Sequence, residues 1–264
     1  MESQDIIYTK EDGIATIILN RPETLNALTN AMTRGWVAAI EDAKKDDAVK
    51  VLVVTGAGRG FCSGANPREL ASRRGSSPSV EQRDAIPNAV GGVIGALLDF
   101  NKPYIGAING PAVGGGMDLA SMFDIRIASD RARFGMTYVR MGVIPGNGGC
   151  YLLPRIVGVA RAAELIWTGR IIDAEEALRI GYVSKVVPHD ELMAATLELV
   201  MQLAKGPSVA IQWAKRLIYQ CLELDIKAAF EAQRQASAIV QRTEDAREGP
   251  RAWVEKREPV FKGR

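Results

Sequence analysis

The chain has 264 residues, of which 47% are hydrophobic, and its 33 basic and 31 acidic residues leave a formal charge of +2. This balance, without long runs of like charge, argues against a nucleic-acid-binding surface and against a disordered chain. No window of about 18 residues is apolar and uncharged, and no cationic segment leads into an apolar one at the start. We therefore expect no membrane span and a cytoplasmic location.

Cysteine and histidine are scarce. The three cysteines, Cys62, Cys150 and Cys221, are odd in number and widely spaced, so neither a disulfide framework nor a metal knuckle is predicted. The single histidine, His189, lies where a helix is expected to begin. A Ser-His-Asp triad and a multi-histidine metal site are therefore not expected, and His189 is interpreted as structural.

The first part of the chain alternates strand-like and helix-like patterns. Strands are expected at 5–10, 13–20, 50–56, 102–110, 124–129 and 181–187, and helices at 32–49, 93–100, 116–123 and 172–180. The run at 50–56 is almost entirely apolar, as in a strand buried on both faces. This order predicts the α/β class, with crossover connections between parallel strands.

From about residue 190 the pattern is helical only. Four segments follow one another, at 190–206, 207–224, 225–242 and 243–258. We predict a core domain at 1–190 and a helical region at 191–264, which forms either a cap on the core or an oligomer contact. A polar stretch at 72–92, rich in Gly, Ser and Pro, is interpreted as a loop beside a pocket.

One glycine-rich segment resembles a nucleotide-binding loop. "GAGRG" at 56–60 follows a strand, but Phe61 stands where a dinucleotide fingerprint would continue toward its third glycine. No Gly-Lys-Ser/Thr follows, which excludes a phosphate-binding Walker loop. An NAD-dependent oxidoreductase is therefore a weak alternative.

Two other glycine turns suggest a different chemistry. "CSGAN" at 62–66 and "VGGGMD" at 113–118 each follow a strand and precede a helix. Two strand ends in one sheet can aim two main-chain amides at one point, and such a donor pair stabilises a developing oxyanion by about 3 kcal/mol per donor. A helix that starts at the glycine triplet would add its dipole. Tight packing is the other explanation for the glycines.

These motifs resemble the crotonase superfamily, the enoyl-CoA hydratase/isomerase group, through nearly the whole chain. The segments that carry the resemblance are "NRPETLNALT" (20–29), "GRGFCSGANPREL" (58–70), "INGPAVGGGMDLASMFDIRIAS" (108–129), "FGMTYVRMGVIPGNGG" (134–149), "WTGRII" (167–172) and "WVEKRE" (253–258). The resemblance implies a spiral of ββα units with a C-terminal helical trimerisation region. It also implies an acyl-CoA substrate, no permanently bound cofactor, and a homotrimer or a dimer of trimers.

The resemblance also implies roles for single residues. The amides of Ala65 and Gly115 would form an oxyanion hole that holds the thioester oxygen while an enolate forms. The residues implied to border coenzyme A are Arg21, Leu25, Ala27, Gly64, Asn66, Trp253 and Lys256, the last two often from a neighbouring subunit. An amphipathic terminal helix explains Trp253 equally well.

The chain departs from the family at its acids. Where family hydratases carry two glutamates, this chain has Asp118 and Tyr138. Tyrosine has a pKa near 10 against about 4.3 for glutamate, so Tyr138 is a poor substitute for a carboxylate base. Asp118 alone suits double-bond isomerisation or carbon–carbon bond hydrolysis, and the loss of an acid also allows a non-catalytic acyl-CoA binder. Arg140 would face the same side as Tyr138 if that segment is extended.

Overall fold

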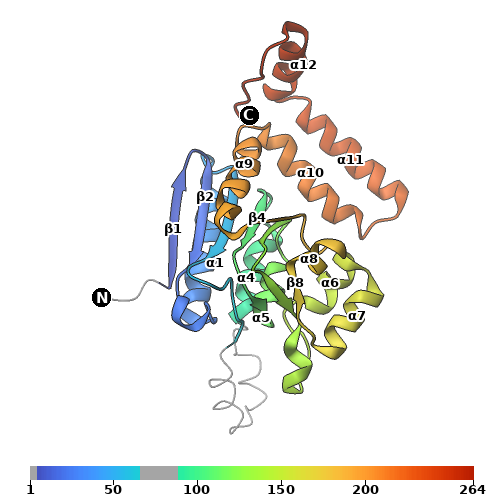
Figure 1. The fold of residues 1–264 in the computed structure, drawn as a ribbon. Coiled ribbons are helices and arrows are strands. Elements are labelled where there is room, and N and C mark those ends of the chain that lie inside the picture. The colour runs from blue at the N-terminus through green and yellow to red at the C-terminus, as the bar shows by residue number, and fades with distance from the viewer. Residues whose placement is uncertain (1–4, 66–88) are drawn as a thin grey trace.

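The computed structural model describes residues 5–65 and 89–264 and is built around a six-stranded sheet (Figure 1). In spatial order its strands are β1 (Ile6–Glu11), β2 (Ile14–Leu19), β3 (Val51–Gly56), β4 (Tyr104–Ile108), β6 (Ile125–Ser129) and β9 (Lys185–Val187). The β1–β2 hairpin is antiparallel and every later pair is parallel. The α/β class and the crossovers predicted from the sequence are thus present.

The hairpin turn follows from its sequence. Asp12 and Gly13 both have positive φ angles, of 49° and 80°. Two such residues in a two-residue turn match the right-handed twist of the flanking strands, which is why Asp-Gly favours this turn.

Helices cover both faces of the sheet. In β3, Val51 and Val53 join the apolar cluster beneath α9 (Leu192–Ala204), whereas Leu52 and Val54 join the larger cluster on the opposite face. Helix α1 (Asn30–Lys45) packs on that second face, and α4 (Ala89–Leu98) lies against α1. Alternation of side chains along a strand buried on both faces produces this division.

A smaller three-stranded sheet lies beside the main one. It contains β5 (Ala112–Val113), β7 (Arg133–Gly135) and β8 (Ile172–Asp173). The helices of this part are α5 (Gly115–Ala120), α6 (Gly149–Val157), α7 (Val159–Thr168) and α8 (Ala174–Arg179). Short 3₁₀ helices in the described part of the chain are η1 (Pro22–Thr24), η2 (Thr137–Met141) and η3 (His189–Glu191). This region holds the candidate site, because α5 and η2 carry its two titratable side chains.

The last three helices extend away from the sheet (Figure 1). They are α10 (Ser208–Cys221), α11 (Ile226–Val240) and α12 (Asp245–Glu255), so the helical C-terminal region predicted from the sequence is confirmed. Lys215 of α10 pairs with Asp124 at 2.9 Å, and the Tyr219 hydroxyl donates to the same carboxylate at 2.7 Å. Since α9 packs on the sheet, the division of the chain at 190 into two domains stays a prediction.

The single histidine and the three cysteines lie in different parts of the fold. His189 begins η3, with its Nδ1 atom 3.1 Å from the Ser129 hydroxyl. The three cysteines are free. Over residues 5–65 and 89–264, no helix is long and apolar enough to cross a membrane, and no group of three or more acidic, His or Cys side chains is arranged to hold a metal ion.

Candidate active site

The two glycine turns identified in the sequence are joined main chain to main chain. The amides of Phe61 and Cys62 both donate to the carbonyl of Pro111, at 3.1 and 3.0 Å, and the Val113 amide donates back to Cys62 at 3.1 Å. A Cβ atom on Gly116 would overlap the Cys62 carbonyl oxygen. Close approach of two backbones therefore explains a glycine of the triplet, and it brings the two turns together.

A second close approach joins Gly64 and Gly115. Gly64 has a φ of +76°, and a Cβ atom there would stand 2.8 Å from the Gly115 nitrogen and 2.7 Å from the Val113 oxygen. Because α5 begins at Gly115, the amide of that residue has no acceptor within the helix. Neither this amide nor that of Ala65 donates to an acceptor among the described residues. Gly64, the residue before Ala65, thus contacts the start of α5, and each of the two turns has a main-chain amide without an acceptor among the described residues.

Asp118 and Tyr138 form a hydrogen-bonded pair beside these turns. Asp118 lies on α5 with no exposed surface, and its Oδ2 atom accepts a very short hydrogen bond from the Tyr138 hydroxyl. The side-chain amide of Asn147 donates to the same hydroxyl at 3.3 Å. Asn147 lies in the "IPGNGG" turn, and sequence reasoning did not select it as a site residue.

The surroundings of this pair change its acidity. Burial raises the pKa of Asp118 to about 6, although the hydrogen bond from Tyr138 and the nearby Asn147 amide group act in the opposite direction. Burial and the neighbouring Asp118 carboxylate raise the pKa of Tyr138 above its ordinary value. A carboxyl group with a pKa near 6 can both accept and release a proton near neutral pH.

The second oxygen of Asp118 faces the start of α6. A Cβ atom on Gly149 would overlap Oδ1, and that same position is 3.0 Å from Pro145 and 3.2 Å from the Met136 methyl group. Oδ1 is buried and has no hydrogen-bond donor among the described residues, and the same holds for Oδ1 of Asn147. Unsatisfied buried acceptors of this kind are rare and are typical of functional sites.

Arg140 does not join the pair. The segment that carries Tyr138 is the 3₁₀ helix η2, not the extended strand that would point both residues to one side. Arg140 is exposed and lies against Gly169. The short helix rotates successive side chains by about a third of a turn, so the expected alternation is lost.

The segment implied to border coenzyme A lies directly beside the first glycine turn. Arg21 donates from Nη1 to the Ala27 carbonyl at 2.9 Å, and Ala27 is buried. Leu25 is half-buried and has a positive φ of 53°. A Cβ atom on Gly60 would stand 3.1 Å from the Leu25 side chain. Gly64 accepts from the Leu28 amide at 2.9 Å. Arg21, Leu25, Ala27 and Gly64 are thus neighbours.

Two buried asparagines hold this arrangement and were missed by the sequence reasoning. Asn26 accepts from the Arg21 amide at 2.7 Å and donates to the carbonyls of Ala57 and Gly60 at 3.0 and 2.8 Å. Asn109 accepts from the Gly56 amide at 3.1 Å and also donates to Gly60. The "GAGRG" glycines therefore pack against these loops and open no helix up to residue 65, which removes the basis of the NAD alternative.

The remaining predicted contacts lie elsewhere or outside the described residues. Trp253 lies on α12 and Lys256 is the C-cap of that helix. Helix α12 lies away from α5, the helix that carries Asp118 (Figure 1). Trp253 is 85% exposed. Asn66 and most of the loop predicted to border the pocket fall outside the described residues.

Comparisons with known proteins decide the family. The family model for enoyl-CoA hydratase/isomerase matches residues 9–264. The chain belongs to the enoyl-CoA hydratase/isomerase family. It is 35% identical over 260 residues to a 2,3-dehydroadipyl-CoA hydratase of Escherichia coli, covering 98% of this chain and 99% of the relative. It is also 35% identical to a crotonyl-CoA hydratase of Syntrophomonas wolfei, covering 99% of each.

The solved structures agree with this assignment. An enoyl-CoA hydratase from Bacillus anthracis superposes with a TM-score of 0.91 at 34% identity, covering 99% of this chain and 100% of that one. The crotonase fold expected from the sequence is thereby confirmed, and the chain is an enzyme of the enoyl-CoA hydratase/isomerase family that acts on acyl-CoA thioesters.

Proposed function

We propose that this enzyme of the enoyl-CoA hydratase/isomerase family holds the thioester oxygen of its substrate between the amides of Ala65 and Gly115 and uses Asp118 for acid/base chemistry at the acyl chain. The observation that carries this proposal is the contact of Gly64 with Gly115 beside a fully buried Asp118. Two preorganised donors at an oxygen where charge develops are the arrangement that stabilises an enolate.

The proposed chemistry is a proton transfer. A C–H bond next to the thioester carbonyl breaks, its proton goes to the Asp118 group, and the electron pair becomes the enolate, with its charge on the held oxygen. Return of the proton at the same carbon gives exchange, and return at a more distant carbon shifts the double bond. Because the pKa of Asp118 lies at about 6, both directions are accessible near neutral pH.

The test is exchange of the α-proton of butyryl-CoA with deuterium from solvent. The enzyme should catalyse the exchange, and Asp118→Asn should slow it by about 10²-fold or more with little change in affinity for butyryl-CoA. Equal exchange by the variant would refute the role given to Asp118. Complete absence of exchange in the unmodified enzyme would instead favour passive binding of the thioester.

A second candidate reaction is double-bond isomerisation without water addition. It is favoured by Tyr138 at the second acid position, because its hydroxyl is already bonded to Asp118 and its raised pKa makes it a poor base for water. Water addition to crotonyl-CoA and double-bond shift in longer enoyl-CoA thioesters should be measured separately. Fast water addition would remove this candidate.

We also propose that Arg21, Leu25, Ala27 and the main chain from Gly64 to Asn66 border coenzyme A, a substrate component, with no permanently bound cofactor. Half-burial of Arg21 and Leu25 beside the glycine turn supports this location. Loss of the Arg21 cation by Arg21→Gln should raise KM for acyl-CoA far more than it lowers kcat. An unchanged KM would contradict the proposal.

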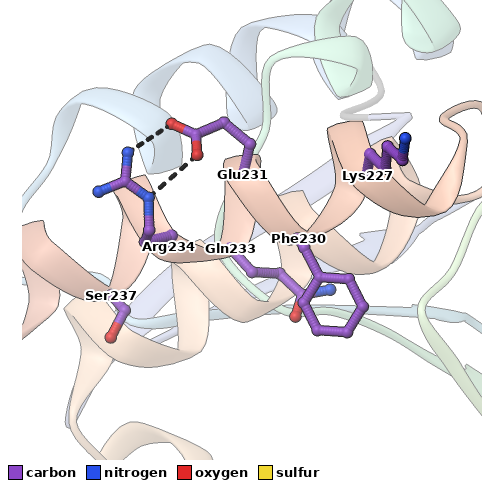
Figure 2. Close-up of a pocket in the computed structure, with 6 residues that line it drawn as sticks. All are labelled: Lys227, Phe230, Glu231, Gln233, Arg234 and Ser237. Carbon is purple, nitrogen blue, oxygen red and sulfur yellow. Dashed lines mark hydrogen bonds and ion pairs between the residues drawn. The ribbon is translucent and has the colours of Figure 1, made fainter.

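We also propose that the protein assembles as a homotrimer or a dimer of trimers and that it is located in the cytoplasm. The projecting helices carry large exposed apolar side chains, including Phe230 at 64% and Trp253 at 85%. Figure 2 shows the hollowed face of α11, lined by Lys227, Phe230, Glu231, Gln233, Arg234 and Ser237. Apolar surface of this extent suits a subunit contact, which would also let Trp253 and Lys256 reach a neighbour's coenzyme A. Analytical ultracentrifugation of the full chain tests it, and a monomer would contradict it.

A further inference from the structure

The Tyr138 hydroxyl and the Asp118 carboxyl group lie differently relative to the two glycine turns. A Cβ atom on Gly115 would stand 3.8 Å from the Tyr138 hydroxyl oxygen, whereas the free oxygen of Asp118 faces Gly149. Tyr138 is half-buried, and Asp118 has no exposed surface. The tyrosine is therefore the member of the pair that lies toward the two glycine turns.

We propose that Tyr138 is the catalytic residue that meets the substrate, and that it relays the proton between the acyl chain and Asp118. This inference rests on the proposed function and adds a step to it. In that step the C–H bond breaks and its proton passes to the Tyr138 oxygen, while the tyrosine's own proton passes to Oδ2 of Asp118. The enolate forms, the tyrosine ends neutral, and Asp118 ends as the carboxylic acid.

A relay removes the objection to tyrosine as a base. Burial and the adjacent carboxylate raise the pKa of Tyr138, so a free tyrosinate is not available near neutral pH. In the relay no tyrosinate forms, because the hydroxyl loses one proton as it gains another. The acidity that governs the step is then that of Asp118, whose pKa lies at about 6.

The hydrogen bonds at Tyr138 fix the direction of the relay. Its proton points to Asp118, and one lone pair accepts from the Asn147 amide at 3.3 Å. The oxygen has a second lone pair, and no other donor among the described residues bonds to it, so we assign that lone pair to the substrate's proton. Asn147 is in this scheme a positioning residue, which holds the hydroxyl without touching the acyl chain.

The test compares three variants by α-proton exchange in butyryl-CoA. Tyr138→Phe should slow exchange by about 10²-fold or more, as Asp118→Asn does, and the double variant should be no slower than the slower single variant, because the two groups act as a unit. Tyr151→Phe, which removes an exposed hydroxyl on α6, is the matched control and should leave exchange unchanged. Affinity for butyryl-CoA should stay within a few-fold in every variant.

Two outcomes separate the relay from the function on which it rests. If Asp118→Asn abolishes exchange but Tyr138→Phe keeps it within a few-fold, the relay is wrong and the proposed function stands. If Asp118→Asn keeps exchange, the proposed function itself is wrong.

A second measurement does not depend on how well the variants fold. Replacement of Tyr138 by 3-fluorotyrosine keeps the ring and its bonds but makes the hydroxyl more acidic. The relay predicts a changed exchange rate and a solvent deuterium isotope effect on the loss of the carbon-bound proton, with a linear dependence on the deuterium fraction, since only the tyrosine's proton comes from an exchangeable site. An unchanged rate without a solvent isotope effect would overturn the relay.

Discussion

The Tyr138 hydroxyl donates to Oδ2 of Asp118, and the opposite oxygen of that carboxyl group packs against the first residue of α6, Gly149. Asp118 is thus enclosed from two sides by segments that lie 20 and 31 positions further along the chain. This enclosure desolvates the carboxyl group, which is the main cause of its raised pKa.

The first prediction concerns the pH dependence of the reaction. Proton abstraction requires ionised Asp118, so exchange of the α-proton of butyryl-CoA should rise with pH and level off above a midpoint at about 6. The rate should be followed from pH 4.5 to 8.5 at saturating thioester. A rate that falls through this range would show that the protonated acid is needed instead.

The second prediction concerns stability. Since the pKa of Asp118 is raised on folding, the folded chain holds more protons than the unfolded chain between about pH 4 and 6, and the free energy of unfolding falls as pH rises through this window. The loss persists above it and amounts to roughly 3 kcal/mol at most. Asp118→Asn should therefore stabilise the protein at pH 7.5 but not at pH 4.

Urea denaturation of both proteins at the two pH values measures this effect. Asp99→Asn is the matched control, because the Asp99 side chain is 83% exposed, and it should change little at either pH. If Asp118→Asn changes the free energy of unfolding by the same amount at both pH values, burial does not raise the pKa of the Asp118 carboxyl group as described.

The third prediction concerns Asn147. The Asn147 amide group lowers the pKa of the nearby Asp118 carboxyl group, so Asn147→Ala should move the midpoint of the exchange profile to higher pH by up to about one pH unit. The maximal rate should also fall, by about tenfold, since the Tyr138 hydroxyl loses a partner. Asn101→Ala, at an exposed asparagine, is the control. An unmoved midpoint would remove Asn147 from the site.

The fourth prediction concerns the contact between the two glycine turns. A methyl group on Gly116 would overlap the Cys62 carbonyl, so Gly116→Ala should force the turns apart, destabilise the protein by about 1–3 kcal/mol and abolish activity. Gly95→Ala is the matched control, because a Cβ there meets nothing within 4 Å on helix α4, and it should stabilise by about 0.4–1 kcal/mol. Thermal unfolding of both variants measures the difference. Normal activity in Gly116→Ala would contradict the close contact.

The sequence predicted much of this structure because its local signals agree with the fold. The apolar run at 50–56 became β3, the glycine triplet opened α5, and the four terminal helices lie where their periodicity indicated. The approach of the two glycine turns was also anticipated, since neighbouring parallel strands end at the same edge of a sheet. These features depend on short-range patterns and on one topological rule.

What the sequence did not reveal depends on contacts between distant segments. Asn26 and Asn109 look like ordinary loop residues, but each is buried and bonds to main chain about 30 and 50 positions away. The 3₁₀ turn at η2, which directs Arg140 to the surface, has no clear sequence signature either. Nothing in the local pattern near Asn147 indicates that it reaches Tyr138.

The pairing of the two glycine turns through main-chain hydrogen bonds has a consequence for how such an enzyme can diverge. Every residue type except proline carries a main-chain N–H group, so the proposed cradle for the thioester oxygen would survive replacement of the side chains around it. In the proposed mechanism, an acid can be exchanged for a phenol at position 138 while the place where charge accumulates stays fixed. New reactions can therefore arise in this framework by altering only the groups that move protons.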